Sequence, residues 1–575
     1  MMPSPTKKHP SSLQRLLALE AASRLGAADT SLFGSEPEVL QHASERLGWP
    51  RLASQPPYAI KKIVERAHSV RASGLDAVVL VGQGGSSQAA MTLTKLHEVG
   101  CAGQVPVAFK TMDSLSPVFV NHILGSSDPA RTLYIISSKS GSTIEVHMLE
   151  QVVWRYVVGH LGAAAAASRF VAITDPGSPL TDLAADKHYR FILPGPVDVG
   201  GRFSALTTYA LLPAALVGID IEQALQEAAQ TERFCCQDSP DNPALQLACF
   251  LYDAYQQGRD KFSLVMPPSG QVFGLWVEQM VAESLGKQGI GILPNVEVDA
   301  SILASPRPDR SVITYAVGKV EGFAESLENI HRSIPRLDMT IDNPTQAFAN
   351  FVVWEYATAF LGILMEVFPF DQPDVEQTKA IVRSLLVGQH LEEKSACRQV
   401  ACSDSLLREM HVSEAMLAGM SAMAEEDNLD CLLRSLLTSI EPGDYFAIDA
   451  FLPFRGYGRR EALERMRNRV ASRLGVASCL EIGPRYLHST GQLQKGGQNN
   501  GVFLMLSADE LDDIVIPRER LTLGTLAAIQ ARADFTALAL RNRRVIYAHL
   551  AGNDAETLSR FADRFCAAVS AVRVD

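Results

Sequence analysis

The sequence predicts an α/β protein with two doubly wound parallel-sheet domains, a helical N-terminal arm and an additional C-terminal α/β region. Short β-rich runs alternate with helix-length segments, which is typical of a parallel sheet covered by helices on both faces. This alternation starts again near residue 262, and a different pattern of helical stretches and β-rich runs follows residue 395. A chain of 575 residues is too long for one core, so about three or four domains are expected.

The arm is expected over residues 1–60, where a polar tail precedes helical apolar spacing at 13–25. The first α/β domain is expected over 61–235, with strands at 77–81, 105–110, 132–136, 170–174 and 189–193. The second is expected over 236–395, with a strand at 262, a helix at 271–287 and a strand at 312–317. The C-terminal region, 396–575, has strand patterns at 445–451, 502–506 and 545–550.

Composition excludes several classes of partner. The net charge of −12 argues against a nucleic-acid partner, because a phosphate backbone requires a basic face. Nine cysteines without metal-type spacing indicate reduced thiols and no metal. The apolar runs are interrupted and shorter than the ~20 residues that cross a bilayer, and the N-terminus lacks the apolar core of a signal peptide. We therefore expect a cytoplasmic protein with no membrane partner.

The segment SSKSGSTIE follows the predicted strand 132–136 and allows two interpretations. One is helix capping, because Ser142 and Glu145 fit the S-x-x-E capping box. The other is anion capture, because a helix N-terminus offers free N–H groups and the positive end of the dipole. Capping does not account for Ser138, Lys139 and Ser140, so we expect the loop to do both.

Two further loops contain glycines next to polar side chains, and the first of them would give, with the Ser138–Thr143 loop, two hydroxyl-rich loops at sheet edges. In VVLVGQGGSSQAA the dinucleotide fingerprint G-x-G-x-x-G fails at Ser87, which leaves a tight turn or a polar pocket at the end of a strand. In VGGRFSAL, Gly200 and Gly201 allow close backbone approach beside Arg202. Arg202 is either a surface side chain or a guanidinium that faces a developing oxyanion.

Three later segments carry ionisable groups. In WVEQMVAESLGKQGIG, helical spacing places Gln279, Glu283 and Lys287 on one face, which is either solvated or functional. FPFDQPDVEQTKA is a proline-marked helix start that contains Lys379, and RYLHSTGQLQKGGQNNG places His488 among small polar residues. Hydroxyls for a phosphate, a carboxylate base and cations for an enediolate together suit proton transfer on a phosphorylated sugar.

These motifs resemble the glucose-6-phosphate isomerase family, with its sugar-isomerase (SIS) domains. The matching stretches are GGSSQ, SSKSGSTIE, VGGRFSAL, EQMVAESLGK, PFDQPDVEQTK and LHSTGQLQKGG. The last of these, and the ending LGTLAAIQARADFTAL, look most like the isomerase half of bifunctional transaldolase–isomerase proteins. Family members usually carry the ring-opening histidine between the base helix and the FDQ motif, an interval in which this chain has only His331. The resemblance therefore assigns that role to His488.

The resemblance implies interconversion of glucose 6-phosphate and fructose 6-phosphate through a cis-enediolate, in glycolysis and gluconeogenesis, without a cofactor. Glu283 would be the base, Arg202 would stabilise the enediolate, and Lys379 would open the ring together with His488. The implied substrate-binding residues are Gly85, Ser86, Ser138, Lys139, Ser140, Thr143, Gly201, Gln279 and Gln372.

The sequence leaves two alternatives open: an isomerase that also accepts mannose 6-phosphate, and a sugar-phosphate-binding protein without turnover. The family resemblance also implies a homodimer.

Overall fold

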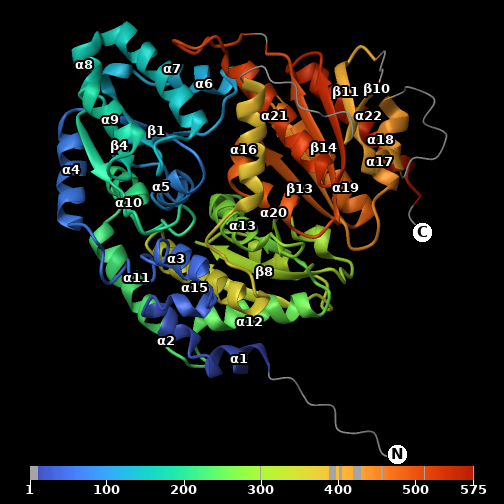
Figure 1. Ribbon diagram of the computed structural model, residues 1–575, viewed down its shortest axis with the longest axis horizontal. Coiled ribbons are helices and arrows are strands. Elements are labelled where there is room, and N and C mark those ends of the chain that lie inside the picture. Colours follow the sequence, from blue (N-terminus) through green and yellow to red (C-terminus); the bar gives the residue numbers. More distant parts are fainter. Residues whose placement is uncertain are drawn as a thin grey trace, which may run out of the picture.

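The computed structural model describes residues 11–297, 299–386, 396–400, 404–418, 429–454, 458–510 and 512–573. The first ten residues of the predicted polar tail lie outside these ranges. Three β-sheets follow one another along the chain, and Figure 1 shows the C-terminal sheet beside the first and next to the second. The mixed α/β architecture predicted from the sequence is confirmed, whereas the exact domain boundaries stay predictions.

The first sheet is entirely parallel, in the order β2-β1-β3-β4-β5. Because the strand order reverses between β1 and β3, the loops that follow these two strands flank the switch point where such sheets bind ligands. Three strands are buried along their whole length, as in a sheet covered on both faces. The strands are β1 (Ala77–Gly82), β2 (Ala108–Met112), β3 (Thr132–Ser137), β4 (Phe170–Thr174) and β5 (Phe191–Pro194).

Alternate residues of β1 pack into different clusters on the two faces of the sheet. Val78 and Leu80 belong to a cluster with the arm, whereas Val79 and Val81 belong to a cluster with α6 and α7. The helices of this part of the chain are α4 (Ile60–Ala72), α5 (Gln88–Gly100), α6 (Pro117–Gly125), α7 (Ile144–Leu161), α8 (Ala163–Ala167), α9 (Pro179–Asp186), α10 (Thr208–Val217) and α11 (Ile221–Cys235).

The second sheet is also parallel and repeats the reversal, in the order β7-β6-β8-β9. Its strands are β6 (Lys261–Val265), β7 (Leu293–Glu297), β8 (Arg310–Val317) and β9 (Arg336–Ile341). The predicted helix at 271–287 is α13 (Gln271–Leu285). The other helices are α12 (Pro243–Gln256), α14 (Phe323–Leu327), α15 (Gln346–Met365) and α16 (Pro373–Leu386).

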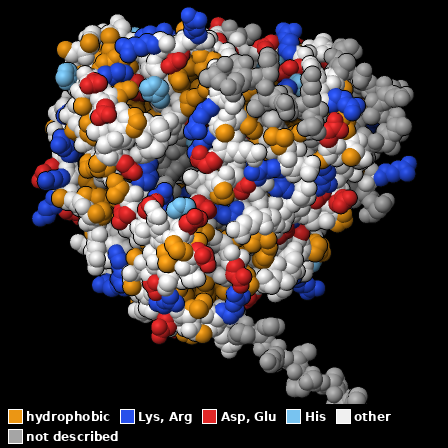
Figure 2. Space-filling model, in the orientation of Figure 1, with side chains coloured by type: hydrophobic (Ala, Val, Ile, Leu, Met, Phe, Trp, Pro, Cys, Tyr) orange, Lys and Arg blue, Asp and Glu red, His pale blue; other side chains and the backbone are white. Residues whose placement is uncertain are grey.

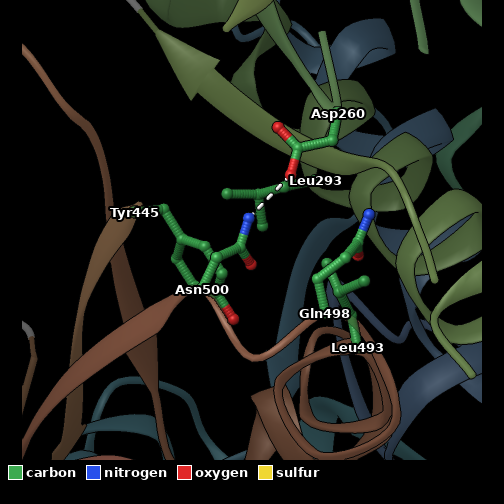
Figure 3. A pocket seen from close by; sticks show the side chains of 6 residues that line it. All are labelled: Asp260, Leu293, Tyr445, Leu493, Gln498 and Asn500. Carbon is green, nitrogen blue, oxygen red and sulfur yellow. Dashed lines mark hydrogen bonds between the residues drawn. The ribbon is translucent and has the colours of Figure 1, made fainter. Parts of the chain in front are cut away.

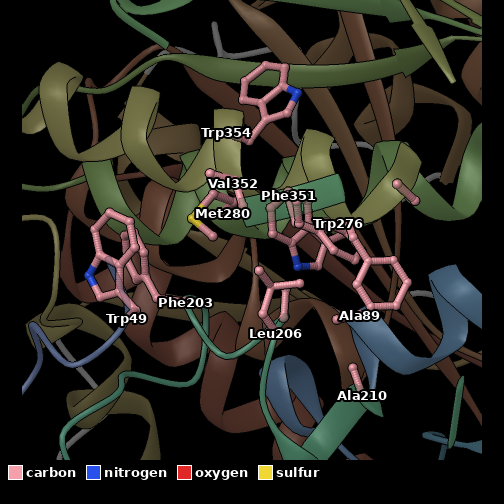
Figure 4. Close-up of a cluster of buried hydrophobic side chains, with 14 of the residues drawn as sticks. Trp49, Ala89, Phe203, Leu206, Ala210, Trp276, Met280, Phe351, Val352 and Trp354 are labelled. Carbon is pink, nitrogen blue, oxygen red and sulfur yellow. The ribbon is translucent and has the colours of Figure 1, made fainter. Parts of the chain in front are cut away.

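Helix α15 corrects one expectation. At 20 residues it is long and apolar enough to cross a membrane, so the expectation that every apolar run is too short was wrong. However, 83% of its apolar window is buried inside the protein. Figure 4 shows Phe351 and Trp354 of α15 in the cluster that also contains Trp276 of α13 and Trp49 of the arm. The apolar length of α15 is therefore that of a core helix.

The arm consists of short helices that pack on both parallel-sheet domains, α1 (Ser12–Ala18), α2 (Ala21–Gly26) and α3 (Pro37–Ser44). The single helix predicted at 13–25 is broken at Glu20, whose φ of 50° is left-handed. Trp49 anchors the end of the arm, with its ring 4.8 Å from that of Phe203 between ring centroids.

The third sheet is mixed, in the order β10-β11-β15-β14-β12-β13, and β11 runs antiparallel to both of its neighbours. Its strands are β10 (Cys397–Val400), β11 (Leu407–Ser413), β12 (Tyr445–Phe451), β13 (Ala477–Ile482), β14 (Gly501–Ala508) and β15 (Arg544–Leu550). The accompanying helices are α17 (Glu414–Ala418), α18 (Leu429–Thr438), α19 (Arg459–Leu474), α20 (Gly491–Gly496), α21 (Leu523–Leu540) and α22 (Ala555–Ala571).

The C-terminal region packs against both parallel-sheet domains. Ile516, Leu523 and Leu526 are buried in the cluster that covers one face of the first sheet. At the junction with the second domain, Asn500 Nδ2 donates a hydrogen bond of 2.7 Å to Asp260 beside a cavity of about 10 Å³ (Figure 3). That volume is about the minimum for one water molecule. The small cavity therefore belongs to the domain junction and is too small for a sugar.

Candidate active site

The loop after β3 presents hydroxyls and backbone N–H groups at the start of α7. Ser138 is buried and its Oγ donates to Thr143 Oγ1 at 3.1 Å. The Ser142 N–H and Oγ both donate to Ser140 Oγ, at 3.3 and 3.0 Å. Helix α7 begins at Ile144, and the side chain of its N-cap residue Thr143 makes no capping hydrogen bond. Such an N-terminus attracts an anion.

The predicted capping box in this loop was wrong. Ser142 bonds to Ser140, and no side chain caps the N-terminus of α7. The Glu145 side chain is buried instead, where Gln530 Nε2 donates to its Oε1 at 2.6 Å. The S-x-x-E pattern describes only local geometry, and contacts with a distant segment override it here.

The predicted phosphate-binding lysine is directed away from the hydroxyls of its own loop. Lys139 Nζ donates to Asp175 Oδ2 at 2.5 Å and to the Pro196 carbonyl at 3.0 Å. Asp175 also accepts a hydrogen bond of 3.0 Å from the Tyr209 hydroxyl. In this arrangement Lys139 links the loop after β3 to the loop after β4.

The loop after β1 contacts the loops on either side of it. Ser137 Oγ donates to the Ser86 carbonyl at 2.7 Å, which joins this loop to the one after β3. A β-carbon on Gly85 would lie 2.0 Å from the Gly201 carbonyl oxygen, so only glycine fits. Ser204 Oγ also donates to the Gly85 carbonyl, at 3.2 Å. The GGSS and VGGR motifs therefore meet at the switch point of the first sheet.

The candidate base lies in a buried ion pair. Arg202 Nη1 lies 3.0 Å from Glu283 Oε1, and the two side chains are only 6% and 11% exposed. Gln279, one helical turn before Glu283, donates from Nε2 to Glu283 Oε2 at 3.2 Å. Arg202 also donates to Gln372 Oε1 at 3.1 Å. The predicted helix face is therefore buried at the site and is not a solvated stripe.

Lys287, predicted as the third residue on that face, lies two residues past the end of α13 and instead anchors the loop that carries Gln372. Its Nζ donates to the Asp371 carboxylate at 2.6 Å and to the Phe368 carbonyl at 2.7 Å. Burial lowers the pKa of Lys287 to about 8, although the Asp371 carboxylate opposes the shift. Arg202 Nη2 donates to the Pro369 and Asp371 carbonyls, so two cations hold the same loop.

His488 reaches the site from the C-terminal region. It ends the 3₁₀ turn η8 (Arg485–His488), and its carbonyl accepts a hydrogen bond of 2.7 Å from Gln279 Nε2. A β-carbon on Gly84 would lie 3.0 Å from its Cβ, which places His488 beside the loop after β1. Its Nε2 lies 3.4 Å from Glu145 Oε1. Burial would raise the pKa of Glu145, but the hydrogen bond and charge of His488 hold it below its ordinary value.

The structure does not bring Lys379 to this group of side chains. Lys379 lies on α16, is 41% exposed, and pairs with Glu376 one turn earlier at 2.6 Å. Glu376 and Gln372 belong to the wall of a surface cavity of about 240 Å³ between the arm and this loop. The complete lining is His42, Glu45, Arg46, Phe368, Phe370, Asp371, Gln372, Pro373 and Glu376.

Sequence reasoning missed the functional contacts of two residues. It gave Glu145 only a capping role, although this residue is the carboxylate beside His488. It gave no role to Gln530, which lies in the quoted segment LGTLAAIQARADFTAL. Within the described ranges, no group of three or more His, Cys, Asp or Glu side chains is placed to hold a metal ion.

The fold and the site together define an α/β protein with a buried polar site near the point where the strand order of a parallel sheet reverses. A hydroxyl-rich loop lies at the switch point of a parallel sheet. The segment that carries Arg202, which pairs with Glu283, meets the neighbouring loop after β1, and His488 lies beside that same loop. The comparison with known proteins agrees with this fold and this site. The profile of the family described as Phosphoglucose isomerase matches residues 60–291.

The chain is similar to a probable glucose-6-phosphate isomerase of Haloarcula marismortui, with 29% identity over 426 residues, 65% of this chain and 94% of the relative. It is 30% identical over 304 residues to a glucose-6-phosphate isomerase of Bacillus cytotoxicus, which covers 45% of this chain and 67% of that relative. The chain belongs to the glucose-6-phosphate isomerase family.

Two solved structures share the fold. A hypothetical protein from Thermus thermophilus superposes with a TM-score of 0.54 and 24% identity, covering 66% of this chain and 97% of that one. A glucose-6-phosphate isomerase from Chlamydia trachomatis gives 0.50 and 18%, covering 68% and 81%. The finer likeness to bifunctional transaldolase–isomerase proteins stays a prediction.

Proposed function

We infer that this chain is an aldose–ketose isomerase that interconverts glucose 6-phosphate and fructose 6-phosphate through a cis-enediolate. The observation that supports this most strongly is the buried Glu283–Arg202 pair at 3.0 Å, which Gln279 connects to His488. A carboxylate that takes and returns a carbon-bound proton is the essential group for this reaction. Membership of the glucose-6-phosphate isomerase family supports the same substrate pair.

In this proposal the loop after β3 holds the phosphate. Ser138, Ser140 and Thr143 supply hydroxyls, and the uncapped N-terminus of α7 supplies N–H groups and the positive end of its dipole. Ser86 contributes from the loop after β1. Lys139 adds positive charge behind the loop, with its ammonium held by Asp175.

The chemical step takes place between Glu283 and Arg202. Glu283 removes the proton from C2 of the open-chain aldose, the electron pair moves to form the C1–C2 double bond, and the carbonyl oxygen becomes an enediolate oxygen. Arg202 stabilises that oxygen, as a fixed cation in a dry site does. Return of the proton to C1, with transfer of the C2 hydroxyl proton to the C1 oxygen, gives the ketose. Gln279 orients both the base and the sugar.

Ring opening is proposed for His488. Its imidazole lies between Glu145 and the loop after β1, and it exchanges protons with the ring oxygen and the anomeric hydroxyl. Lys379 stays a predicted partner in this step, although its ammonium is paired with Glu376 here. Gln372 completes the wall of the site through its hydrogen bond with Arg202.

Glu283→Gln is the direct test, with Glu278→Gln as the matched control. Removal of the base should lower the rate of isomerisation and of C2-proton exchange with solvent by on the order of 10²–10⁴. Glu278 is a buried carboxyl on the same helix, and burial together with Glu481 raises its pKa well above its ordinary value. Gln resembles the protonated form of Glu278, so we expect the control to retain activity.

Three outcomes separate the candidate functions. Near-normal turnover of Glu283→Gln would remove this residue from the mechanism. Binding of glucose 6-phosphate by the unaltered protein without C2-proton exchange would favour a sugar-phosphate-binding protein. Turnover of mannose 6-phosphate in a substrate panel would favour the dual-specificity isomerase.

We also propose that the chain is a cytoplasmic homodimer. The family resemblance supports the dimer, and the net charge of −12 is compatible with a soluble location. On the face shown in Figure 2, acidic and basic side chains are interspersed between small hydrophobic patches. Light scattering of the purified protein tests the dimer directly.

A further inference from the structure

The C-terminal region supplies a second group near the site, Gln530, whose partner is the carboxylate beside His488. Gln530 lies in the middle of α21, and its side chain is buried. Its Nε2 donates a hydrogen bond of 2.6 Å to Glu145 Oε1, the same oxygen that lies 3.4 Å from His488 Nε2. Three segments that are far apart in the sequence therefore meet at one carboxylate oxygen.

The position of Gln530 is fixed by packing. Leu526 precedes it by one helical turn on the same face of α21 and is buried against the first parallel-sheet domain together with Leu523. Glu145 lies in the first turn of α7 in that domain. Docking of the C-terminal region therefore sets the distance between the Gln530 amide and the Glu145 carboxylate.

A buried carboxylate needs hydrogen-bond donors to stay ionised and in one orientation. Glu145 is faced by His488 from η8 and by Gln530 from α21, and its own backbone N–H adds a further favourable contact. Gln530 is neutral, so its hydrogen bond favours the ionised carboxylate without a competing charge. An ionised Glu145 can accept a hydrogen bond from the N–H at His488 Nε2, which leaves Nδ1 to exchange a proton with the sugar.

We propose that Gln530 is a positioning residue for ring opening, which acts by holding Glu145 as the hydrogen-bond acceptor of His488. This proposal rests on the proposed isomerase function and deepens it. It gives the C-terminal helix α21 a part in one chemical step, the opening of the sugar ring. The proton transfer between C1 and C2 at Glu283 does not depend on it.

Ring opening can be measured by itself. Opening and reclosing of the ring interconverts the α and β anomers of glucose 6-phosphate, which NMR exchange spectroscopy follows. In a Glu283→Gln background the carbon-bound proton stays in place, so anomerisation reports ring opening without isomerisation. The test variants in this background are Gln530→Met, which removes the donor, and Gln530→Glu, which replaces the donor with a titratable carboxyl of the same shape.

Gln530→Met should lower enzyme-catalysed anomerisation by about tenfold to a hundredfold at every pH, the value of a hydrogen bond to a charged group. Gln530→Glu should show a similar loss at high pH and recover as the pH falls, because a protonated carboxyl again donates to Glu145. Gln494→Met is the matched control: Gln494 is another buried glutamine of the C-terminal region, and its Nε2 donates to Asp449 at 3.0 Å. This control should keep the parent rate of anomerisation.

Anomerisation at the parent rate in Gln530→Met would overturn the proposal. Equal losses in Gln530→Glu at all pH values would also overturn it, because a purely structural role has no reason to recover on acidification. If Gln530→Met does not fold, the pH profile of Gln530→Glu decides alone. Failure of the proposed function is distinct: the unaltered protein would then catalyse neither isomerisation nor anomerisation.

Discussion

The parallel-sheet domains and the C-terminal region contribute to the site in different ways. The parallel sheets contribute Ser138 and Arg202 from segments that follow strands, where α/β folds commonly bind ligands, and Glu283 from the last turn of α13. The C-terminal sheet is mixed, and it contributes His488 from a 3₁₀ turn and Gln530 from the middle of a helix.

This difference indicates a division of chemical work. In the proposed mechanism, groups from the parallel sheets hold the phosphate and move the carbon-bound proton, whereas the C-terminal region supplies the imidazole of His488 and the Gln530 amide that donates to Glu145. The two sets touch at only a few hydrogen bonds among the described residues, such as Gln279 Nε2 to the His488 carbonyl. Substitutions on the two sides should therefore impair different steps.

The largest expected effect that tests this division comes from His488→Gln. Glutamine cannot exchange protons, so isomerisation of the cyclic sugar should fall by on the order of 10²–10⁴, and enzyme-catalysed anomerisation should be lost. Glu283→Gln should lose the first activity and keep the second. His411→Gln is the control, because His411 is also buried in the C-terminal region beside a carboxylate, with Nε2 3.3 Å from Glu409.

Retained anomerisation in His488→Gln would mean that the C-terminal region has only a structural role. A loss of anomerisation in the His411→Gln control would show that ring opening is sensitive to the packing of the whole region. Either result would contradict the proposed division of chemical steps between the parallel-sheet domains and the C-terminal region.

A smaller effect, on the parallel-sheet side, is expected from Arg202→Lys. Lysine keeps the charge but loses the planar fork that holds Glu283, Gln372 and two loop carbonyls. We expect kcat for isomerisation to fall by about 10²-fold, with anomerisation near the parent rate. Arg467→Lys is the control, since Arg467 makes a buried pair of 2.6 Å with Glu297 and should affect stability without this loss of kcat. Parallel losses of both activities in Arg202→Lys would contradict the division.

The same contrast explains which strands could be predicted from the sequence. Strands β1, β3 and β4 are continuous apolar runs in a covered parallel sheet, and their patterns predict them closely. Strand β9 alternates exposed and partly buried residues at a sheet edge, and β13 ends in Leu480, Glu481 and Ile482. Their residues match no continuous apolar run, so sequence reasoning passed over both strands.

The site was predictable where its chemistry is local. The hydroxyl loop and the Gln279–Glu283 face each follow from short motifs that can be read in the sequence. The partners of Glu145 do not, because His488 and Gln530 lie 343 and 385 positions away. A local rule therefore gave Glu145 the wrong partner. Only the packing of α21 against the first domain reveals its role.

The smallest effect concerns stability on the parallel-sheet side, at Lys287. Its folded-state pKa of about 8 lies below the ordinary lysine value of 10.5, because burial disfavours the charge. As the pH rises above about 8 the folded protein releases this proton before the unfolded chain does. The unfolded chain then binds more protons, so this group adds stability with rising pH. The free energy of unfolding of the unaltered protein, measured relative to that of Lys287→Met, should therefore rise by about 1–2 kcal/mol from pH 7.5 to 9.5.

Denaturant unfolding of both proteins across this pH range, followed by tryptophan fluorescence, measures that gap. Below pH 7 the two curves should run parallel, because Lys287 is then protonated in both the folded and the unfolded states, which provides an internal control. A constant gap up to pH 9.5 would show that the Asp371 carboxylate and the loop carbonyls fully offset the burial of the ammonium. The 368–371 loop would then be held by a permanently charged lysine, and the site would keep two fixed cations, Lys287 and Arg202, at every pH at which the enzyme works.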